Sequence, residues 1–119
     1  LMGNWDDLLG IHTTALNLQR SRMDVLASNI ANADTPGYKA KDIDFREALD
    51  AIETGGVNGG ASIDGAVKDR IPLQPSIDGN TVELSTEQTA FAENAVAYQT
   101  TLAFLNGRIS TLTRALKGE

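Results

Sequence analysis

Residues 84–117 read LSTEQTAFAENAVAYQTTLAFLNGRISTLTRALK and carry the strongest structural pattern in the sequence. One line of residues through this stretch recurs at alternating spacings of four and three: Leu84, Gln88, Phe91, Ala95, Tyr98, Leu102, Leu105, Ile109, Leu112 and Leu116. Only Gln88 interrupts the apolar character of the line. This heptad rhythm predicts a helix that buries one stripe against a second helix.

Local signals place this helix over residues 85–117. Ser85 is a candidate N-cap, and Gln88, three residues later, completes a capping box. Gly107 lies inside the helix, where glycine costs about 1 kcal/mol relative to alanine. We therefore expect either a closely approaching backbone or a bend at Gly107.

A second helix is predicted over residues 5–31, with Asn4 as its cap. Leu9, Leu16, Met23 and Ile30 recur every seven residues and match the seam of the C-terminal helix. A second apolar line runs beside them through Ile11, Leu18 and Val25. A helix with two such lines has more to bury than one partner covers. The second line is therefore expected to contact neighbouring subunits, or alternatively a third element of the same chain.

The segment between the helices, residues 32–84, is predicted to be irregular. Pro36 and Gly37 suit the two central positions of a turn over residues 34–38. Residues 42–45 resemble a short extended piece, and one or two helical turns are expected over residues 46–53.

The rest of this middle segment contains a glycine-rich linker and candidate turns. Residues 54–62 contain too much glycine to hold a fixed structure on their own. The prolines within residues 71–75 favour an extended path. The pair Asp78 and Gly79 suits a tight turn, and a small β-hairpin is expected over residues 77–84.

Length and composition predict one mainly α domain over residues 1–119, with its two long helices packed as an antiparallel, coiled-coil-like hairpin. The formal net charge of −6 and the absence of a basic patch argue against a nucleic-acid partner. The chain has no cysteine, and no apolar run is long enough to cross a bilayer. We also see no pattern of a cleaved secretory signal.

No residue pattern predicts catalysis, a metal or a cofactor. His12 is the single histidine, and Ser28 lacks a nucleophile-elbow context. The glycines of residues 55–60 lack the Gly-Lys-Ser/Thr ending of a phosphate loop. Asp78 belongs to a turn without the further oxygen ligands that calcium requires. We therefore expect a protein that is not an enzyme.

Residues 27–39, ASNIANADTPGYK, resemble the N-terminal signature of the flagellar axial proteins, which include rod, hook and hook-associated subunits. Asn32 suits a left-handed helix C-cap within that signature. Residues 40–45 and 74–82, and residues 91–94 followed by Tyr98, are similar to motifs of the proximal rod proteins of the flagellar basal body.

This resemblance implies a structural rod subunit that leaves the cell through the flagellar type III export apparatus and assembles into the rod crossing the periplasm. It implies self-association and contacts with other rod subunits, the rod-to-membrane-ring adaptor and the membrane ring. It also implies terminal helices that are poorly ordered in the free subunit and fold together in the assembly.

Two sets of residues are predicted to carry the assembly. The predicted assembly interface consists of Ile11, Leu18, Val25, Asn29, Asn32, Pro36, Gly37 and Tyr38. The predicted helix seam consists of Leu9, Leu16, Met23, Ile30, Phe91, Tyr98, Leu102, Leu105, Ile109 and Leu112. The same seam would also serve a soluble dimeric coiled-coil adaptor, because heptads report burial and not the identity of the partner.

Overall fold

The computed structural model describes residues 2–55 and 65–118. The described chain measures 64 × 28 × 18 Å and is mainly helical. Its elements, in chain order, are α1 (Met2–Ala31), β1 (Lys41–Ile43), α2 (Phe45–Gly55), β2 (Val67–Asp69) and α4 (Leu84–Lys117).

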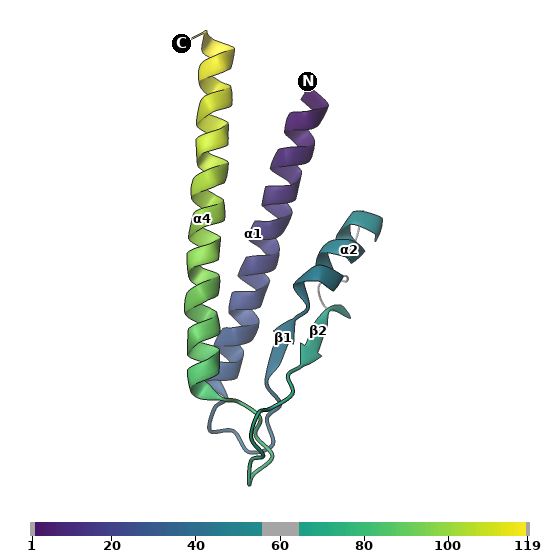
Figure 1. The fold of residues 1–119 in the computed structure, drawn as a ribbon, viewed down its shortest axis with the longest axis vertical. Coiled ribbons are helices and arrows are strands. Elements are labelled where there is room, and N and C mark those ends of the chain that lie inside the picture. Colours follow the sequence, from purple (N-terminus) through teal and green to yellow (C-terminus); the bar gives the residue numbers. More distant parts are fainter. Residues whose placement is uncertain (1, 56–64, 119) are drawn as a thin grey trace.

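The two long helices, α1 and α4, lie side by side and run in opposite directions (Figure 1). Near the loop end of the pair, Asn29 of α1 bonds Glu87 of α4 at 2.9 Å. Farther toward the termini, the rings of His12 and Phe104 pack at 4.6 Å between their centroids. The predicted antiparallel hairpin of terminal helices is confirmed. The helices diverge toward the two chain ends (Figure 1).

Both helices begin earlier than the sequence signals predicted. The N-cap of α4 is Glu83, which has extended backbone and makes no side-chain cap hydrogen bond. Its carboxylate instead accepts a bond from the Leu73 N–H at 3.1 Å, so the predicted capping box at Ser85 is wrong. Helix α1 begins at Met2, so Asn4 lies inside the helix and does not cap it.

A two-stranded antiparallel sheet forms in the middle of the chain, with Lys41 opposite Asp69 and Ile43 opposite Val67. The predicted extended piece and the following helix are therefore confirmed as β1 and α2. The small β-structure expected in the middle of the chain is thus present but was placed wrongly at 77–84, since residues 77–83 form bends and loop and Leu84 begins α4. The predicted glycine-rich linker begins inside α2, and the rest of it, residues 56–62, lies outside the described residues.

A small apolar core lies between α1 and the sheet with its adjoining helix. Its buried members are Leu18, Ile43, Ala48 and Ala66, and Val25, Phe45, Leu49 and Val67 pack against them. Leu18 is 0% exposed and therefore offers no surface to another molecule in this conformation. Leu18 and Val25, which belong to the second apolar line of α1, are thus covered by the sheet and α2 of the same chain.

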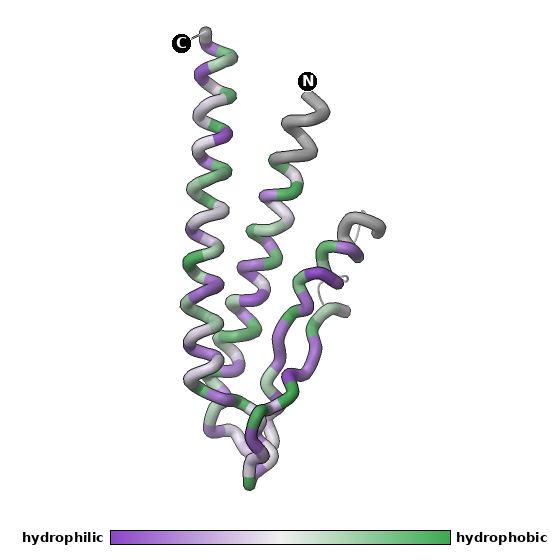
Figure 2. Tube along the Cα trace, in the orientation of Figure 1, coloured by the Kyte–Doolittle hydropathy of each residue, from purple (hydrophilic) through white to green (hydrophobic). Residues whose placement is uncertain are grey.

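Apolar residues alternate with polar ones along both long helices (Figure 2). Among the described residues, no helix is both long and apolar enough to cross a membrane.

Candidate functional site

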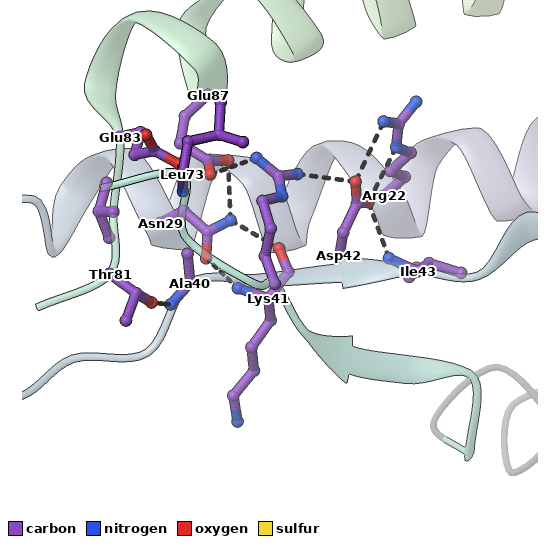
Figure 3. A network of polar contacts seen from close by, with 12 residues as sticks. Arg22, Asn29, Ala40, Lys41, Asp42, Ile43, Leu73, Thr81, Glu83 and Glu87 are labelled. Atoms are coloured by element: carbon purple, nitrogen blue, oxygen red, sulfur yellow. Dashed lines mark hydrogen bonds and ion pairs between the residues drawn. The ribbon is translucent and has the colours of Figure 1, made fainter. Parts of the chain in front are cut away.

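The two long helices and the sheet meet around Asn29, which is completely buried (Figure 3). The Asn29 amide nitrogen donates to the Lys41 carbonyl at 2.6 Å and to Glu87 Oε2 at 2.9 Å. Its amide oxygen accepts from the Lys41 N–H at 3.0 Å. A single side chain of α1 thus fixes both the start of β1 and the first turns of α4.

A network of four charged side chains adjoins Asn29. Arg22 forms a two-point contact with Asp42, at 2.9 and 3.1 Å. Arg70 donates to Asp42 Oδ2, which also accepts from Arg22, at 2.7 Å, and Arg70 also pairs with Glu87. Two arginines balance two carboxylates, so the fully buried Glu87 has a cationic partner.

This network controls the protonation of Asp42. Burial alone would raise the pKa of Asp42, but hydrogen bonds from Arg22, the Ile43 N–H and Arg70, together with the Arg22 charge, lower the pKa below its ordinary value of 3.8. The hydrogen bond to Asp42 likewise raises the pKa of Arg22. Asp42 therefore stays ionised and paired well into the acidic range.

Asn80 holds the end of α1 to the loop that precedes α4. Its amide nitrogen donates to three carbonyls, those of Asn32 at 2.9 Å, Ala33 at 3.0 Å and Thr35 at 2.7 Å. Its amide oxygen accepts from the Val82 N–H at 2.7 Å. Carbonyls at a helix C-terminus lack intrahelical partners, and Asn80 supplies a donor for them.

The turn after α1 and the turn at Asp78 bind each other through their backbones. Gly37 N–H donates to the Asp78 carbonyl at 2.9 Å, and Thr81 N–H donates to the Tyr38 carbonyl at 2.9 Å. Gly37 has a φ of +74°, as the predicted turn requires. The left-handed C-cap predicted at Asn32 is wrong, because no described residue other than glycine has positive φ.

Polar contacts also bind the helices to each other farther along. The buried Asn94 of α4 donates to the Gln19 carbonyl of α1 at 2.7 Å. The Gln19 side chain in turn donates to Thr101 at 3.3 Å. These contacts fix the register of the hairpin about midway along its length.

The residues of the predicted interface fall into three groups. Leu18 and Asn29 are buried, whereas Val25, Asn32 and Tyr38 are half-buried. Ile11, Pro36 and Gly37 are exposed.

The residues of the predicted seam are mostly half-buried. This group contains Leu9, Leu16, Met23, Ile30, Phe91, Tyr98, Leu102, Leu105 and Leu112, while Ile109 is exposed. Whether either predicted set contacts other subunits stays a prediction.

Several residues of the junction were not predicted from the sequence, chiefly Glu87, Arg70, Asn80 and Asn94. Their partners are far away in the chain, with Arg70 and Glu87 meeting Asp42 and Asn29 across three elements. A signal was available for two of them, because Asn80 and Asn94 each lie within a motif quoted for the resemblance. Across the described ranges, no three His, Cys, Asp or Glu side chains are grouped as metal ligands.

Comparison with known proteins assigns this arrangement to a class. A family model described as "Flagella basal body rod protein" matches residues 9–39, which cover most of α1 and the turn that Asn80 holds. Over these residues the chain is similar to flagellar basal body rod proteins.

Relatives that align over nearly the whole chain show which rod protein this chain resembles. The chain is 48% identical to the flagellar basal body rod protein FlgB of Cereibacter sphaeroides, over 99% of this chain and 100% of that protein. It is 44% identical to FlgB of Aeromonas hydrophila, over 98% of this chain and 97% of that protein. It is 38% identical to FlgB of Salmonella typhimurium, over 99% of both chains.

The chain belongs to the FlgB family of flagellar basal body rod proteins. This family is structural and serves motility, and its place is the basal body rod, where its members associate with other flagellar components.

Proposed function

We propose that this chain polymerises through its terminal helices to form the proximal segment of the rod, the drive shaft that crosses the periplasm. The observation that carries the proposal is the exposed apolar surface that the hairpin leaves uncovered. Ile11 is 56% exposed on α1, and Leu116 is 77% exposed on α4. Ile109 and Phe104 are exposed between them.

These side chains supply a driving force for assembly. Removing a large aliphatic side chain from water contributes about 1.5–3 kcal/mol. The helices diverge toward their ends (Figure 1), and partners within the chain leave much of Ile11, Ile109 and Leu116 exposed, whereas the Phe104 ring packs against His12. A subunit contact repeated without closure produces a rod, whereas a self-complementary contact stops at a dimer.

The polar contacts between α1 and α4 suit a part that transmits torque. Asn29 with Glu87, and Gln19 with Asn94, tie the helices together at two separate levels. Buried polar pairs of this kind oppose sliding of one helix along the other, because a shifted register leaves donors and acceptors unpaired. A subunit locked in this way passes a twisting load to its neighbours without deforming.

The proposed partners are other proximal rod subunits, the rod-to-membrane-ring adaptor and the membrane ring, with export through the flagellar type III apparatus. Family membership and the exposed apolar residues toward the ends of the hairpin support this proposal. Copies of this chain are also proposed to contact one another.

The test is Ile109→Asp compared with Ser110→Asp in cells that lack the native protein. Both positions are exposed on α4, and both variants add the same charge. We expect Ile109→Asp to abolish incorporation into basal bodies and swimming, with export unchanged, and Ser110→Asp to keep both. Normal swimming of Ile109→Asp cells would remove this face of α4 from the subunit contacts.

A second candidate is a soluble dimeric coiled-coil adaptor, because the exposed apolar residues of α4 would also fit a closed two-chain bundle. Circular dichroism combined with light scattering separates the two. A partly ordered monomer that polymerises as its concentration rises supports the rod subunit. A highly helical dimer that persists at low concentration supports the adaptor.

A further inference from the structure

Arg70 lies directly after β2, in the segment that leads to α4, and its side chain contacts two other elements. Its guanidinium donates to Asp42 of β1 at 2.7 Å and pairs with Glu87 in the first turns of α4. Asp42 in turn forms the two-point contact with Arg22 of α1. A single arginine side chain thus joins the small sheet to the start of α4.

The sheet determines where this arginine lies. The Arg70 N–H donates to the carbonyl of the completely buried Ala40 at 2.7 Å. This bond continues the β1–β2 ladder by one residue beyond the pair of Lys41 and Asp69. Pairing of the two strands therefore holds Arg70 at the position from which its guanidinium reaches Glu87.

Glu87 makes the position of Arg70 important for α4. Its side chain is completely buried, and it bonds Asn29 of α1 as well as Arg70. Asn29 carries no charge, so Arg70 is the cation that bonds Glu87 directly in the described part of the chain. A buried carboxylate that loses its cationic partner is strongly unfavourable. Docking of the first turns of α4 on α1 therefore requires Arg70 at its place beside the sheet.

Opening of the sheet should therefore open the hairpin at its loop end. If the strands come apart, Arg70 leaves Glu87, and this carboxylate regains water only when α4 moves away from α1. Asn29 bonds both Glu87 and the Lys41 backbone, so β1 and α4 also share this partner on α1. The sheet and the start of α4 are thus expected to form and open as one cooperative unit.

We propose that Arg70 makes closure of the α1–α4 hairpin at its loop end conditional on formation of the β1–β2 sheet. The middle segment thereby controls whether the two terminal helices pair, although its strands contain only three residues each. The coupling is a property of the single chain and does not rest on polymerisation. It bears on the proposed function, because a subunit with separated helices would not present the surface through which we propose it to assemble.

Lys68→Pro tests the coupling, because it disrupts the sheet and keeps both members of the buried ion pair. Lys68 lies opposite Asp42, and the bond of the Arg70 N–H to Ala40, two residues along, makes the Lys68 position hydrogen-bonded as well. Proline at position 68 therefore removes a donor of the ladder. Lys68→Ala is the matched control, since it keeps this N–H and also loses the exposed contact with Glu47.

Hydrogen exchange measured on the whole chain follows the two elements separately. The Asp44 and Arg70 amides report the sheet, and the amides of residues 87–91 report the start of α4. Lys68→Pro should speed exchange in both groups by about tenfold or more relative to Lys68→Ala. Adding Glu87→Gln removes the buried charge and keeps the shape of the side chain. This second change should restore slow exchange at residues 87–91 while the sheet amides stay fast.

Arg70→Met tests the ion pair without a change in the strands. It should speed exchange at residues 87–91 by about tenfold or more, because it leaves Glu87 buried without its cation. Glu87→Gln in the same chain should reverse this loss. A loss that Glu87→Gln does not reverse would show that Arg70 acts through packing, and it would overturn the proposal.

Three results of the sheet experiment would also overturn the proposal. Slow exchange at residues 87–91 in Lys68→Pro would show that α4 docks without the sheet. Fast exchange there that Glu87→Gln fails to reverse would show that the link does not run through this carboxylate. Fast exchange of both groups in the wild-type chain would show that the single chain does not close by itself. Each result would leave the proposed function standing, because none of them measures polymerisation.

Discussion

At the scale of single residues, Asn29 is the side chain of α1 that bonds to both β1 and α4. Its amide nitrogen donates to the Lys41 carbonyl and to Glu87, its amide oxygen accepts from the Lys41 N–H, and the side chain is fully buried. An asparagine can both donate and accept, and an aspartate of the same shape can only accept. This position therefore requires the hydrogen-bond donors of asparagine, which an ionised aspartate of the same size lacks.

Asn29→Asp should reduce the free energy of unfolding by about 3 kcal/mol or more, because it removes two donors and places a second carboxylate against buried Glu87. Ser28→Asp is the matched control, since it adds the same charge at an exposed position one residue earlier. Denaturant unfolding of both variants measures the difference. Equal stabilities would show that the Asn29 bonds contribute nothing to the fold.

Gly37 is the second residue with a defined requirement, because its φ of +74° is unfavourable for branched side chains. A Cβ added at Gly37 would meet nothing within 4 Å, so the expected cost is argued from backbone strain. Gly37→Val should cost about 2 kcal/mol in thermal unfolding. Gly37→Asn should cost clearly less, since asparagine tolerates positive φ. Equal losses in the two variants would point away from backbone strain.

At the scale of elements, the sequence predicts those helices and turns that have a local sequence pattern. The heptad line from Phe91 to Leu112 identified α4, and Pro36 with Gly37 identified the turn. The strand β2 was missed, because three residues, Val67–Asp69, carry no periodic signal and form a strand only by pairing with β1.

The helix starts and the junction were missed for a related reason. Ser85 and Gln88 satisfied the local rule for a cap, but tertiary contacts of Glu83 placed the start elsewhere. Arg70 and Glu87 form a pair whose members lie on different elements, and no local pattern reports such a pair. Local rules thus located elements, and long-range polar contacts determined how they join.

The ion pairs of Asp42 attach the sheet to α1 and predict a pH dependence. Because the pKa of folded Asp42 lies below its ordinary value of 3.8, its pairing stabilises the fold above that pH. The stabilisation is lost as pH falls through the folded pKa.

Unfolding free energy should therefore decrease below about pH 4. Asp42→Asn should be on the order of 2 kcal/mol less stable near pH 7 and should show a smaller further loss on acidification. An unchanged acid slope in Asp42→Asn would assign the pH dependence to other groups.

Within α4, Gly107 has open space around its missing side chain, and nothing in the described chain lies within 4 Å of an added methyl group. Gly107→Ala should therefore stabilise the isolated chain by about 1 kcal/mol. Gly10→Ala in α1 meets equally open space and should behave alike.

If a neighbouring backbone approaches Gly107 in the rod, Gly107→Ala should reduce incorporation into basal bodies more than Gly10→Ala does. Thermal unfolding and basal-body incorporation, measured on both variants, separate the two effects. Failure of Gly107→Ala to raise stability would show that the helix is bent or frayed at this point.

At the scale of the whole molecule, the chain is a long hairpin whose interior contacts concentrate near the loop end. The polar junction around Asn29 and the paired turns lie toward the loop end of the molecule (Figure 1), and the apolar core extends from there to Leu18, near the middle of α1. The diverging ends retain exposed Ile11, Ile109 and Leu116. Contacts within the chain are thus concentrated toward the loop end. The exposed apolar side chains nearer the termini are left for neighbouring subunits to cover.

The most direct test of this division is a cryo-EM map of an intact basal body that resolves the side chains of this subunit. We expect α1 and α4 to pair within each copy, with Asn29 against Glu87, and Ile11, Ile109 and Leu116 to be covered by adjacent subunits. A map in which these three side chains face water, or in which α1 pairs with α4 of another copy, would contradict the account.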